Sequence, residues 1–443
     1  MAGLKDGIDR RFGLTLNGTT VRTEVVAGFT TFLTMAYIIL VNPAILSQTG
    51  MPIAAVTAAT CLSAAFASIL MGFTANYPLA LAPGMGLNAY FTFSVVKGLG
   101  LPWETALGCV FISGLVFLLL TFVGIRQLIV SAIPKHLYAA VAGGIGLFIA
   151  FIGLKDAGIV VGNPATTVAL GDLRSAGPAL ALGGLMIIGV LNAWRVRGAV
   201  LIGILATTAA AWALNLVHVA PQPYDLSVLT ATAFKLDIPA ALDLGKTGLG
   251  VLEIIFVFLF VDLFDNIGTL VGVSKKAGLI GEDGTIPRLH RIFISDSIAT
   301  MAGALLGTST VTSYVESAAG VEVGGRTGLT AIVTGLLFLV ALFFAPYAQY
   351  IPAAATAPAL IIVGAMMMAS LAEIEWSDPL IALPAFLTLI GIPLTFSIAN
   401  GLAFGLTSYA ILKLLRGRAT WRDGILFVLA GLFVFRFFYL SGS

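Results

Sequence analysis

Two aspartates, Asp262 and Asp265, lie near the middle of a dense apolar run at residues 258–273, FLFVDLFDNIGTLVGV. An ionised aspartate at the centre of a bilayer costs at least ~2.5–3.5 kcal/mol of insertion free energy, and the run contains no lysine or arginine. The acids are three residues apart, so they share one face of a helix. A carboxyl group buried without a cation favours its protonated form, so it can carry a proton. It can also accept N–H hydrogen bonds from a neutral heterocycle.

Asp265 has the surroundings that better suit a binding residue. Phe264, Asn266 and Thr269 lie around it on the same helix. An aromatic ring beside such polar groups suits a flat, nitrogen-rich solute and a proton-coupled carrier. Asp262 could equally bond to backbone or to polar groups of a neighbouring helix, as intramembrane acids often do. We therefore favour a binding role for Asp265 and leave Asp262 open.

A third acid, Glu316, lies in a segment at 305–328 that changes character midway. Residues 307–314, GTSTVTSY, are rich in β-branched and hydroxyl side chains, which predicts an extended stretch. VESAAG then begins a short helix, whose N-terminus stabilises a carboxylate. Glu316 and Ser317 could bind a polar ligand there. The alternative is a structural cap, but serine or threonine would cap at lower burial cost, so we favour binding.

An amide occupies the matching position in an earlier segment, LALAPGMGLNAYFTF at 79–93. Pro83 and Gly84 prevent one continuous helix, which predicts an extended crossing of half the membrane and then a short helix from about Met85. Irregular backbone at membrane depth is tolerated only where it is buried in protein or lines a cavity. We therefore expect Asn88 to face a ligand, the alternative being a hydrogen bond between helices.

The composition predicts an all-α polytopic membrane protein. The chain has 443 residues, of which 59% are hydrophobic and 10% charged, and its mean hydropathy is +1.04; soluble chains are about 25% charged. Fourteen apolar segments are predicted, and a further one at 424–440 could span or lie along the surface. The fourteen fall at about 25–45, 53–73, 82–97, 105–123, 137–154, 178–194, 199–217, 250–273, 291–307, 313–323, 327–346, 355–372, 379–397 and 400–415.

Charge places the N-terminus in the cytoplasm. With fourteen crossings and that orientation, most lysines and arginines fall in inside loops, as the positive-inside rule requires. The longest extramembrane piece follows the seventh segment and divides the chain into two halves. The third segment of each half is short and glycine-rich, and such matched interruptions are the best sequence indication of a transporter binding site.

Several function classes are excluded or disfavoured by residue type. Cys61 and Cys109 lie in apolar runs, and the histidines at 136, 218 and 290 are scattered at predicted helix ends. We therefore expect no catalytic set, no metal site and no cofactor. The net charge of +2 is spread over loops, so no nucleic acid partner is indicated. A channel would need polar residues along a continuous path, and they occur near one level only. Asp296 could support the site, but a structural bond is equally possible.

Four motifs occur in order along the chain: NPAIL, APGMGLNAYF, FVDLFDNIGTLVGV and GTSTVTSYVESAAGVEVGGRTG. As a set they resemble the AzgA-like adenine/guanine/hypoxanthine permeases, within the nucleobase–cation symporter-2 and nucleobase–ascorbate group. The resemblance covers essentially the whole chain. It implies two inverted repeats of seven segments, a core domain and a gate domain, and transport of a purine base with a proton by an elevator-like shift.

The resemblance also implies which residues meet the base. The substrate-binding asparagine falls on Asn88, and the acids of segments eight and ten fall on Asp265 and Glu316, at least one of which carries the proton. Main-chain groups beside Ala89 and Val315 should face the base. Phe264 or Phe91 could stack on it, and Asp262 and Ser317 complete the predicted binding set.

The implied domain plan divides the chain into seven parts. These are the cytoplasmic N-terminus (1–24), the core domain (25–123 and 249–346), the gate domain (124–217 and 347–416), an extracytoplasmic connection (218–248) and a C-terminal tail with an apolar helix (417–443). The expected location is the cytoplasmic (inner) membrane, with a homodimer through the gate domain as a possible assembly. The alternatives are an anion or sulfate-type carrier of this fold, which two midplane acids disfavour, and a pyrimidine or xanthine carrier.

Overall fold

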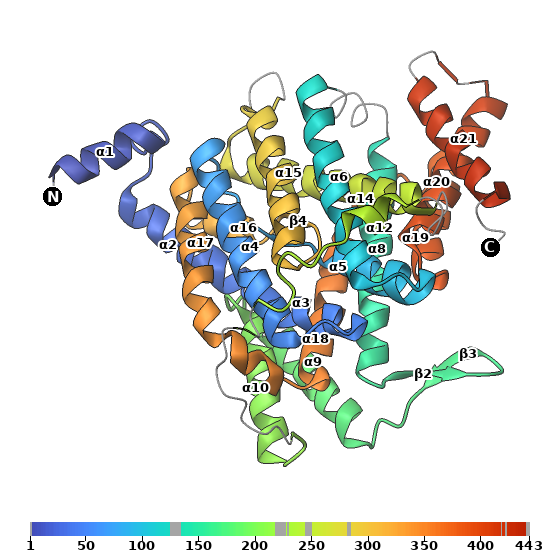
Figure 1. Cartoon of the computed structure of the whole chain (residues 1–443), viewed down its shortest axis with the longest axis horizontal. Helices are drawn as coiled ribbons and strands as arrows, with labels where there is room; N and C mark the ends of the chain where they lie inside the picture. The colour runs from blue at the N-terminus through green and yellow to red at the C-terminus, as the bar shows by residue number, and fades with distance from the viewer. Residues whose placement is uncertain are drawn as a thin grey trace.

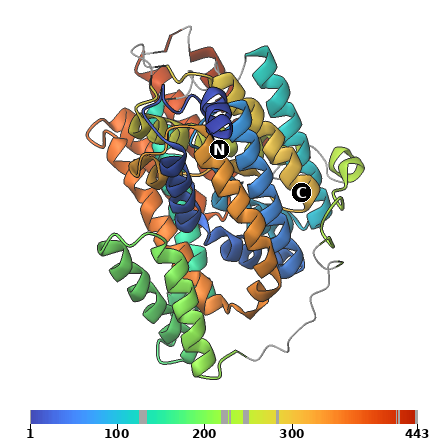
Figure 2. The ribbon, with the colours of Figure 1, turned by 90° about the vertical axis from the view of Figure 1, so that its left-hand side faces the viewer.

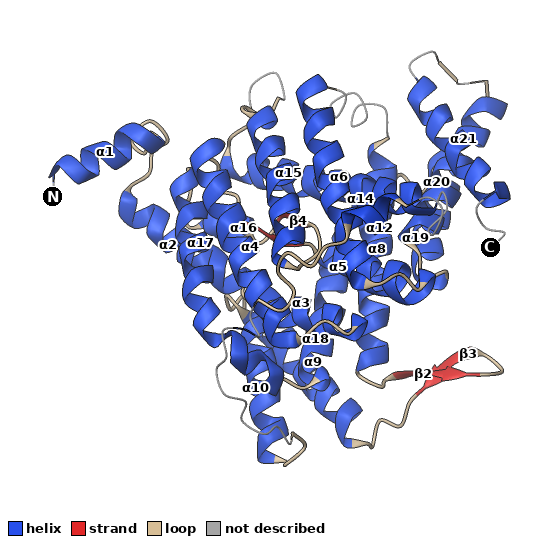
Figure 3. Ribbon diagram, viewed as in Figure 1, coloured by secondary structure: helices blue, strands red, loops and turns tan. Residues whose placement is uncertain are grey.

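The computed structural model describes residues 2–124, 134–217, 227, 230–243, 250–280, 285–417, 419–420 and 423–439. Most of them are helical (Figure 3). Of the predicted extracytoplasmic connection at 218–248, the structure describes residue 227 and residues 230–243. The first half comprises α1 (Ala2–Phe12), α2 (Val21–Met35), α3 (Ile38–Leu46), η1 (Ser47–Thr49), α4 (Ile53–Thr74), β1 (Leu81–Pro83), α5 (Met85–Ala89), η2 (Tyr90–Gly98), α6 (Trp103–Val123), α8 (Lys135–Asp156), β2 (Val160–Asn163), β3 (Thr167–Leu170), α9 (Ala176–Ala193), α10 (Ala199–Ala213) and α12 (Ile238–Leu242).

The second half repeats the mixture of long helices and one broken segment. It comprises α14 (Gly250–Ala277), α15 (Leu289–Leu306), β4 (Val311–Ser313), α16 (Ser317–Glu322), α17 (Gly328–Ala341), η3 (Leu342–Tyr350), α18 (Ala353–Met367), η4 (Met368–Glu373), α19 (Pro379–Leu394), α20 (Ile398–Leu415) and α21 (Gly424–Tyr439).

The interrupted third and tenth segments are confirmed. Extended residues precede a short helix in both, β1 before α5 and β4 before α16. The two strands pair antiparallel, with Ala82 opposite Thr312, although they are more than two hundred residues apart in sequence. Both strands are fully buried. Pairing satisfies backbone groups that no helix bonds, which is what buried irregular backbone requires.

A second, exposed hairpin was not predicted. Strands β2 and β3 pair between α8 and α9, and the hairpin projects from the helical body (Figure 3). Its turn is closed by Oδ1 of Asn163, which accepts hydrogen bonds from the N–H groups of Ala165 and Thr166. The expectation of a purely α-helical chain is therefore wrong at this loop, because β-branched valine and threonine residues flank an asparagine turn.

Nine helices in the described part of the chain are long and apolar enough to cross a membrane, by length and composition. Further apolar helices of 10 to 17 residues are Ala199–Ala213, Pro379–Leu394 and Gly424–Phe435. The first segment begins at Val21, earlier than predicted, and its helix is interrupted at Ala36–Tyr37. The count of fourteen crossings stays a prediction, because a count of long apolar helices does not include segments that are broken into shorter pieces.

The helices pack in two sets (Figure 1). In one, α17 contacts α2 and α4, while α15 contacts α4 and α6 and α14 contacts α6 and α16. In the other, α8 contacts α18 and α19, and α9 contacts α10 and α18. Figures 1 and 2 both show α9 and α10 together at one end of the molecule. Buried aromatic residues, including Phe91, Phe148, Phe258 and Phe338, belong to one apolar cluster that joins the sets.

Candidate functional site

The β1–β4 pair brings the two broken segments together. Beyond the strands, the N–H of Gly84 donates to the carbonyl of Thr310 at 3.0 Å, and the N–H of Tyr314 donates to the carbonyl of Ala80 at 3.0 Å. Because the strands run antiparallel, α5 and α16 leave the pair in opposite directions. Their N-termini, where the positive ends of the helix dipoles lie, therefore flank one crossing point.

Hydroxyl groups hold this crossing point in place. Ser68 Oγ accepts from the N–H of Leu81 at 3.0 Å, and Ser317 Oγ accepts from the N–H of Ala80 at 3.0 Å. The Tyr314 hydroxyl donates to the carbonyl of Pro83 at 2.5 Å. Ser317 was predicted as a ligand-binding residue, and the structure places its oxygen on the backbone of the opposite broken segment instead.

Glu316 is the N-cap residue of α16, as the sequence predicted. The hydroxyl of Tyr37 donates to its Oε1 at 2.5 Å. Tyr37 is buried and lies where the first segment breaks between α2 and α3. The carboxyl group is thus fixed by a side chain from a different segment, with part of Glu316 still accessible.

Asp265 lies on α14 beside the start of α5. A methyl group built on Gly84 would lie 3.6 Å from Oδ2 of Asp265 and 2.8 Å from Cγ2 of Thr312. Gly84 therefore permits the close approach of β1 to Thr312 on β4, while Asp265 lies at an ordinary contact distance from the same position. Glu316 and Asp296 are the carboxyl groups that interact electrostatically with Asp265. Asp265 and Glu316 therefore lie near enough to influence each other, and their joint role in binding stays a prediction.

Asn88 is completely buried on α5. The hydroxyl of Ser309, just before β4, donates to its Oδ1. Within the described residues, Asn88 Nδ2 has no hydrogen-bond partner, although it is buried. A buried amide N–H without an acceptor is costly, and no described residue supplies the missing acceptor. The alternative for Asn88 was a hydrogen bond between helices. The bond from Ser309 uses the Asn88 Oδ1 atom and does not involve Nδ2.

The other predicted residues differ in accessibility. Val315 is 52% exposed, next to Glu316, whereas Ala89 and Phe91 have no exposed surface in this conformation. The Phe264 ring lies 4.3 Å from the ring of Tyr138 on α8, which joins the two packing sets. Asp262 is buried. Both rings are buried, Phe91 completely and Phe264 with 6% of its surface exposed, so stacking on either ring would require it to become more exposed; Phe264 is the candidate at the border between the sets.

Two structural residues escaped the sequence reasoning. Glu24 is completely buried, and its carboxylate accepts hydrogen bonds from the backbone N–H groups of Arg326 and Thr330. Asn42 of the NPAIL motif donates to Thr60 and Thr308, which ties the first segment to the second and tenth. A carboxyl group and an amide next to apolar residues could have indicated these two structural roles. The predicted domain plan instead places Glu24 in the cytoplasmic N-terminus (1–24).

Among the described residues, no group of three or more histidine, cysteine, aspartate or glutamate side chains could hold a metal ion. The arrangement offers instead two carboxyl groups and one amide around a backbone crossing. Such a set can pair with N–H groups and ring acceptors of a flat solute, and its carboxyl groups can take up a proton.

Comparisons with known proteins identify the family of the chain. Residues 22–406 match a family model described as a permease family. The adenine permease AdeP of Escherichia coli is 45% identical, with 98% of this chain and 96% of AdeP aligned. The guanine/hypoxanthine permease PbuG of Bacillus subtilis is 45% identical, with 96% of this chain and 98% of PbuG aligned. The transmembrane domain of the cyanobacterial bicarbonate transporter BicA, 16% identical, has a TM-score of 0.62 and covers 87% of this chain and 97% of that domain. This last likeness concerns the fold alone.

Proposed function

This chain belongs to the permease family, and from that premise we propose that it imports purine bases across a cytoplasmic membrane by proton symport. The observation that carries the proposal is the convergence of Asp265, Glu316 and Asn88 at the crossing of two broken segments. Relatives named for adenine and for guanine/hypoxanthine support a purine as the solute.

Each residue has a chemical task in this proposal. The carboxyl groups of Asp265 and Glu316 accept N–H groups of the base, and at least one of them binds the coupled proton. Asn88 Nδ2 donates to a ring nitrogen or carbonyl. Main-chain groups beside Ala89 and Val315 face the base, and Phe264 stacks on its ring. Carboxyl groups and amides are the side chains that pair with nucleobase edges in other proteins.

The proposed movement is an elevator-like shift of a core domain, 25–123 and 249–346, against a gate domain, 124–217 and 347–416. Support comes from the packing, since successive contacts link α2, α17, α4, α15, α6 and α14, and others link α10, α9, α18, α8, α19 and α20, while α2 with α10 and α14 with α8 are contacts between the two sets. The bound base would travel with the strand pair, which belongs to the core. We further propose fourteen crossings with a cytoplasmic N-terminus, and a homodimer through the gate domain.

Uptake of labelled adenine, guanine, hypoxanthine, xanthine and uracil tests this function in cells that lack their own nucleobase carriers. We expect purine uptake that collapses with a protonophore, and no uptake by Asp265→Ala at an equal membrane level. Bicarbonate or sulfate transport without base uptake would overturn the proposal in favour of an anion carrier, the alternative that the BicA-like fold keeps open. Normal uptake by Asp265→Ala would overturn the site.

A further inference from the structure

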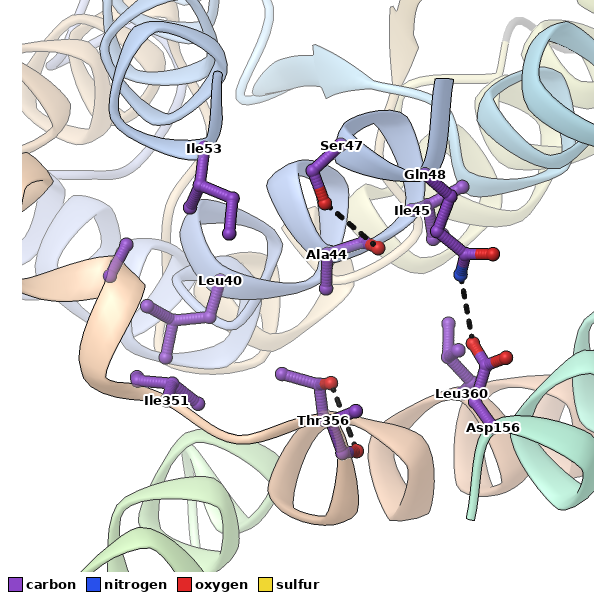
Figure 4. Close-up of a pocket in the computed structure, with 12 residues that line it drawn as sticks. Leu40, Ala44, Ile45, Ser47, Gln48, Ile53, Asp156, Ile351, Thr356 and Leu360 are labelled. Carbon is purple, nitrogen blue, oxygen red and sulfur yellow. Dashed lines mark hydrogen bonds between the residues drawn. The ribbon is translucent and has the colours of Figure 1, made fainter. Parts of the chain in front are cut away.

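A cavity lies away from the strand pair. It has a volume of about 330 Å³ and is formed by the end of α3, η1, the last residue of α8 and the region where η3 leads into α18. Neither Asn88, Asp265 nor Glu316 lines it. Figure 4 shows Gln48 and Asp156 together on one side of the cavity, and Leu40 and Ile351 on the other.

On the polar side of the cavity, two hydrogen bonds link Lys97, Gln48 and Asp156. Gln48 Nε2 donates to Oδ2 of Asp156 at 3.1 Å, and Nζ of Lys97 donates to Oε1 of Gln48 at 2.9 Å. Lys97 therefore fixes the Gln48 amide with its NH₂ group turned toward the carboxylate. Gln48 and Asp156 are both only partly buried, so a solute could reach them.

This pair of side chains selects a class of solute. Glutamine pairs in two places with the acceptor and amino groups of an adenine edge, and a carboxylate accepts from an exocyclic amino group. Branched apolar residues such as Leu40, Ile351 and Leu360 offer a surface for the faces of a flat ring. Pockets for small molecules begin at about 300 Å³, so this one suits a compact ligand. Lys97 and Lys155 lie near Asp156 and partly balance its charge, so the hydrogen-bond pattern of Gln48 and Asp156, rather than charge, favours a neutral heterocycle.

We propose that this cavity is a second purine-binding site, an entry subsite that the base occupies before it reaches the crossing point. The inference rests on the proposed function. In the predicted orientation the ends of α3 and α8 and the start of α18 all lie on the extracytoplasmic side. The base replaces the Gln48 amide as the donor to Asp156 and pairs with the Gln48 that it displaces.

Equilibrium binding of labelled adenine and hypoxanthine to the purified full chain tests the subsite. In Glu316→Ala, weak binding is expected to persist, and adding Asp156→Asn should weaken it at least about tenfold, as the loss of a hydrogen bond to a charged group implies. Complete loss of binding in Glu316→Ala alone, with uptake by the wild type intact, would overturn the subsite and leave the proposed function standing. No binding or uptake by the wild type would overturn both.

Uptake kinetics separate a binding site from a mechanical bridge between segments. Asp156→Asn in the otherwise native chain should raise KM about tenfold or more and leave the maximal rate within about twofold. Asp172→Asn, which changes an exposed carboxylate on the loop after β3, is the matched control and should change neither. A changed maximal rate with unchanged KM would overturn the subsite, because the Gln48–Asp156 pair would then control movement alone.

Discussion

At the scale of the residue, the Tyr37 hydroxyl shows how a membrane protein positions an acid. It donates to Glu316 at 2.5 Å from a break in another segment. A hydrogen bond to a charged group contributes about 1.5–3 kcal/mol, so Tyr37→Phe should lower purine uptake, measured as maximal rate over KM, roughly tenfold to hundredfold. The measurement is the initial rate of adenine and hypoxanthine uptake at several concentrations.

The matched control removes a tyrosine hydroxyl elsewhere. Tyr350 lies on η3, where its ring contacts Trp212 and Tyr347. Tyr350→Phe should keep these ring contacts and the wild-type uptake. Wild-type uptake by Tyr37→Phe, at an equal membrane level, would contradict the idea that Glu316 must be held by this hydroxyl.

At the scale of the element, the strand pair depends on the absence of a side chain at Gly84. A methyl group there would lie 2.8 Å from Thr312 Cγ2, closer than such atoms approach. Gly84→Ala should therefore separate β1 from β4, displace Asp265 and abolish uptake. Gly177→Ala on α9, where a methyl group would meet nothing within 4 Å, should transport normally. Equal uptake by the two variants would show that the close approach is dispensable.

The start of α17 depends on a buried carboxylate from α2. Glu24 accepts from Arg326 N, Thr330 N and the Thr330 hydroxyl. Removing an acceptor from buried donors costs about 1–3 kcal/mol for each group. With three donors left unpaired, Glu24→Ala should lower the free energy of unfolding by at least about 3 kcal/mol. Thermal unfolding of the detergent-purified protein measures the loss. Glu104→Ala, in the first turn of α6, is the control and should change the unfolding midpoint little. An equal fall of the midpoint in Glu24→Ala and Glu104→Ala would contradict the idea that Glu24 holds the start of α17.

The broken elements could be predicted because their causes are local. Pro83 and Gly84 exclude a continuous helix, and the hydroxyl-rich run before Glu316 disfavours one. The partners of these segments could not be predicted. Nothing in the local pattern says that Ala82 faces Thr312, that Tyr37 reaches Glu316 or that Ser317 bonds to Ala80, since these contacts join distant parts of the chain. The sequence was therefore enough to predict which residue types form the site, whereas the residues that hold them in place could be identified only from the structure.

At the scale of the whole molecule, the antiparallel strands connect topology with mechanism. If the two halves cross the membrane in opposite senses, the third segments of the two halves must run in opposite directions where they meet. Strands β1 and β4, which belong to these segments, do run antiparallel. The helix N-termini of both halves then meet at one level, where a single base can contact both. The proposed inverted repeat thus explains why a chain of long helices contains two buried strands of three residues each.

The proposed crossings give a test of topology at three positions. Thiol labelling of intact cells by a membrane-impermeant maleimide should modify Thr166→Cys on the hairpin tip. It should modify Thr420→Cys only after permeabilisation. Helix α21 has 16 residues, as many as α19, which is counted among the proposed crossings, so its length permits either a crossing or a position at the surface. It packs on α20, and its Phe433 ring lies 5.6 Å from that of Phe256 on α14. Labelling of Ser443→Cys therefore decides whether α21 crosses the membrane.

The native chain is the control for this labelling. Cys61 and Cys109 are buried among apolar residues, and burial there makes thiols inert, so the unmodified protein should stay unlabelled. Labelling of Thr420→Cys from outside would mean an odd number of crossings before α21 and would overturn the fourteen-segment plan. Labelling of Ser443→Cys alone from outside would instead make α21 a further crossing, because the cytoplasmic loop before it would stay protected while the chain end emerged.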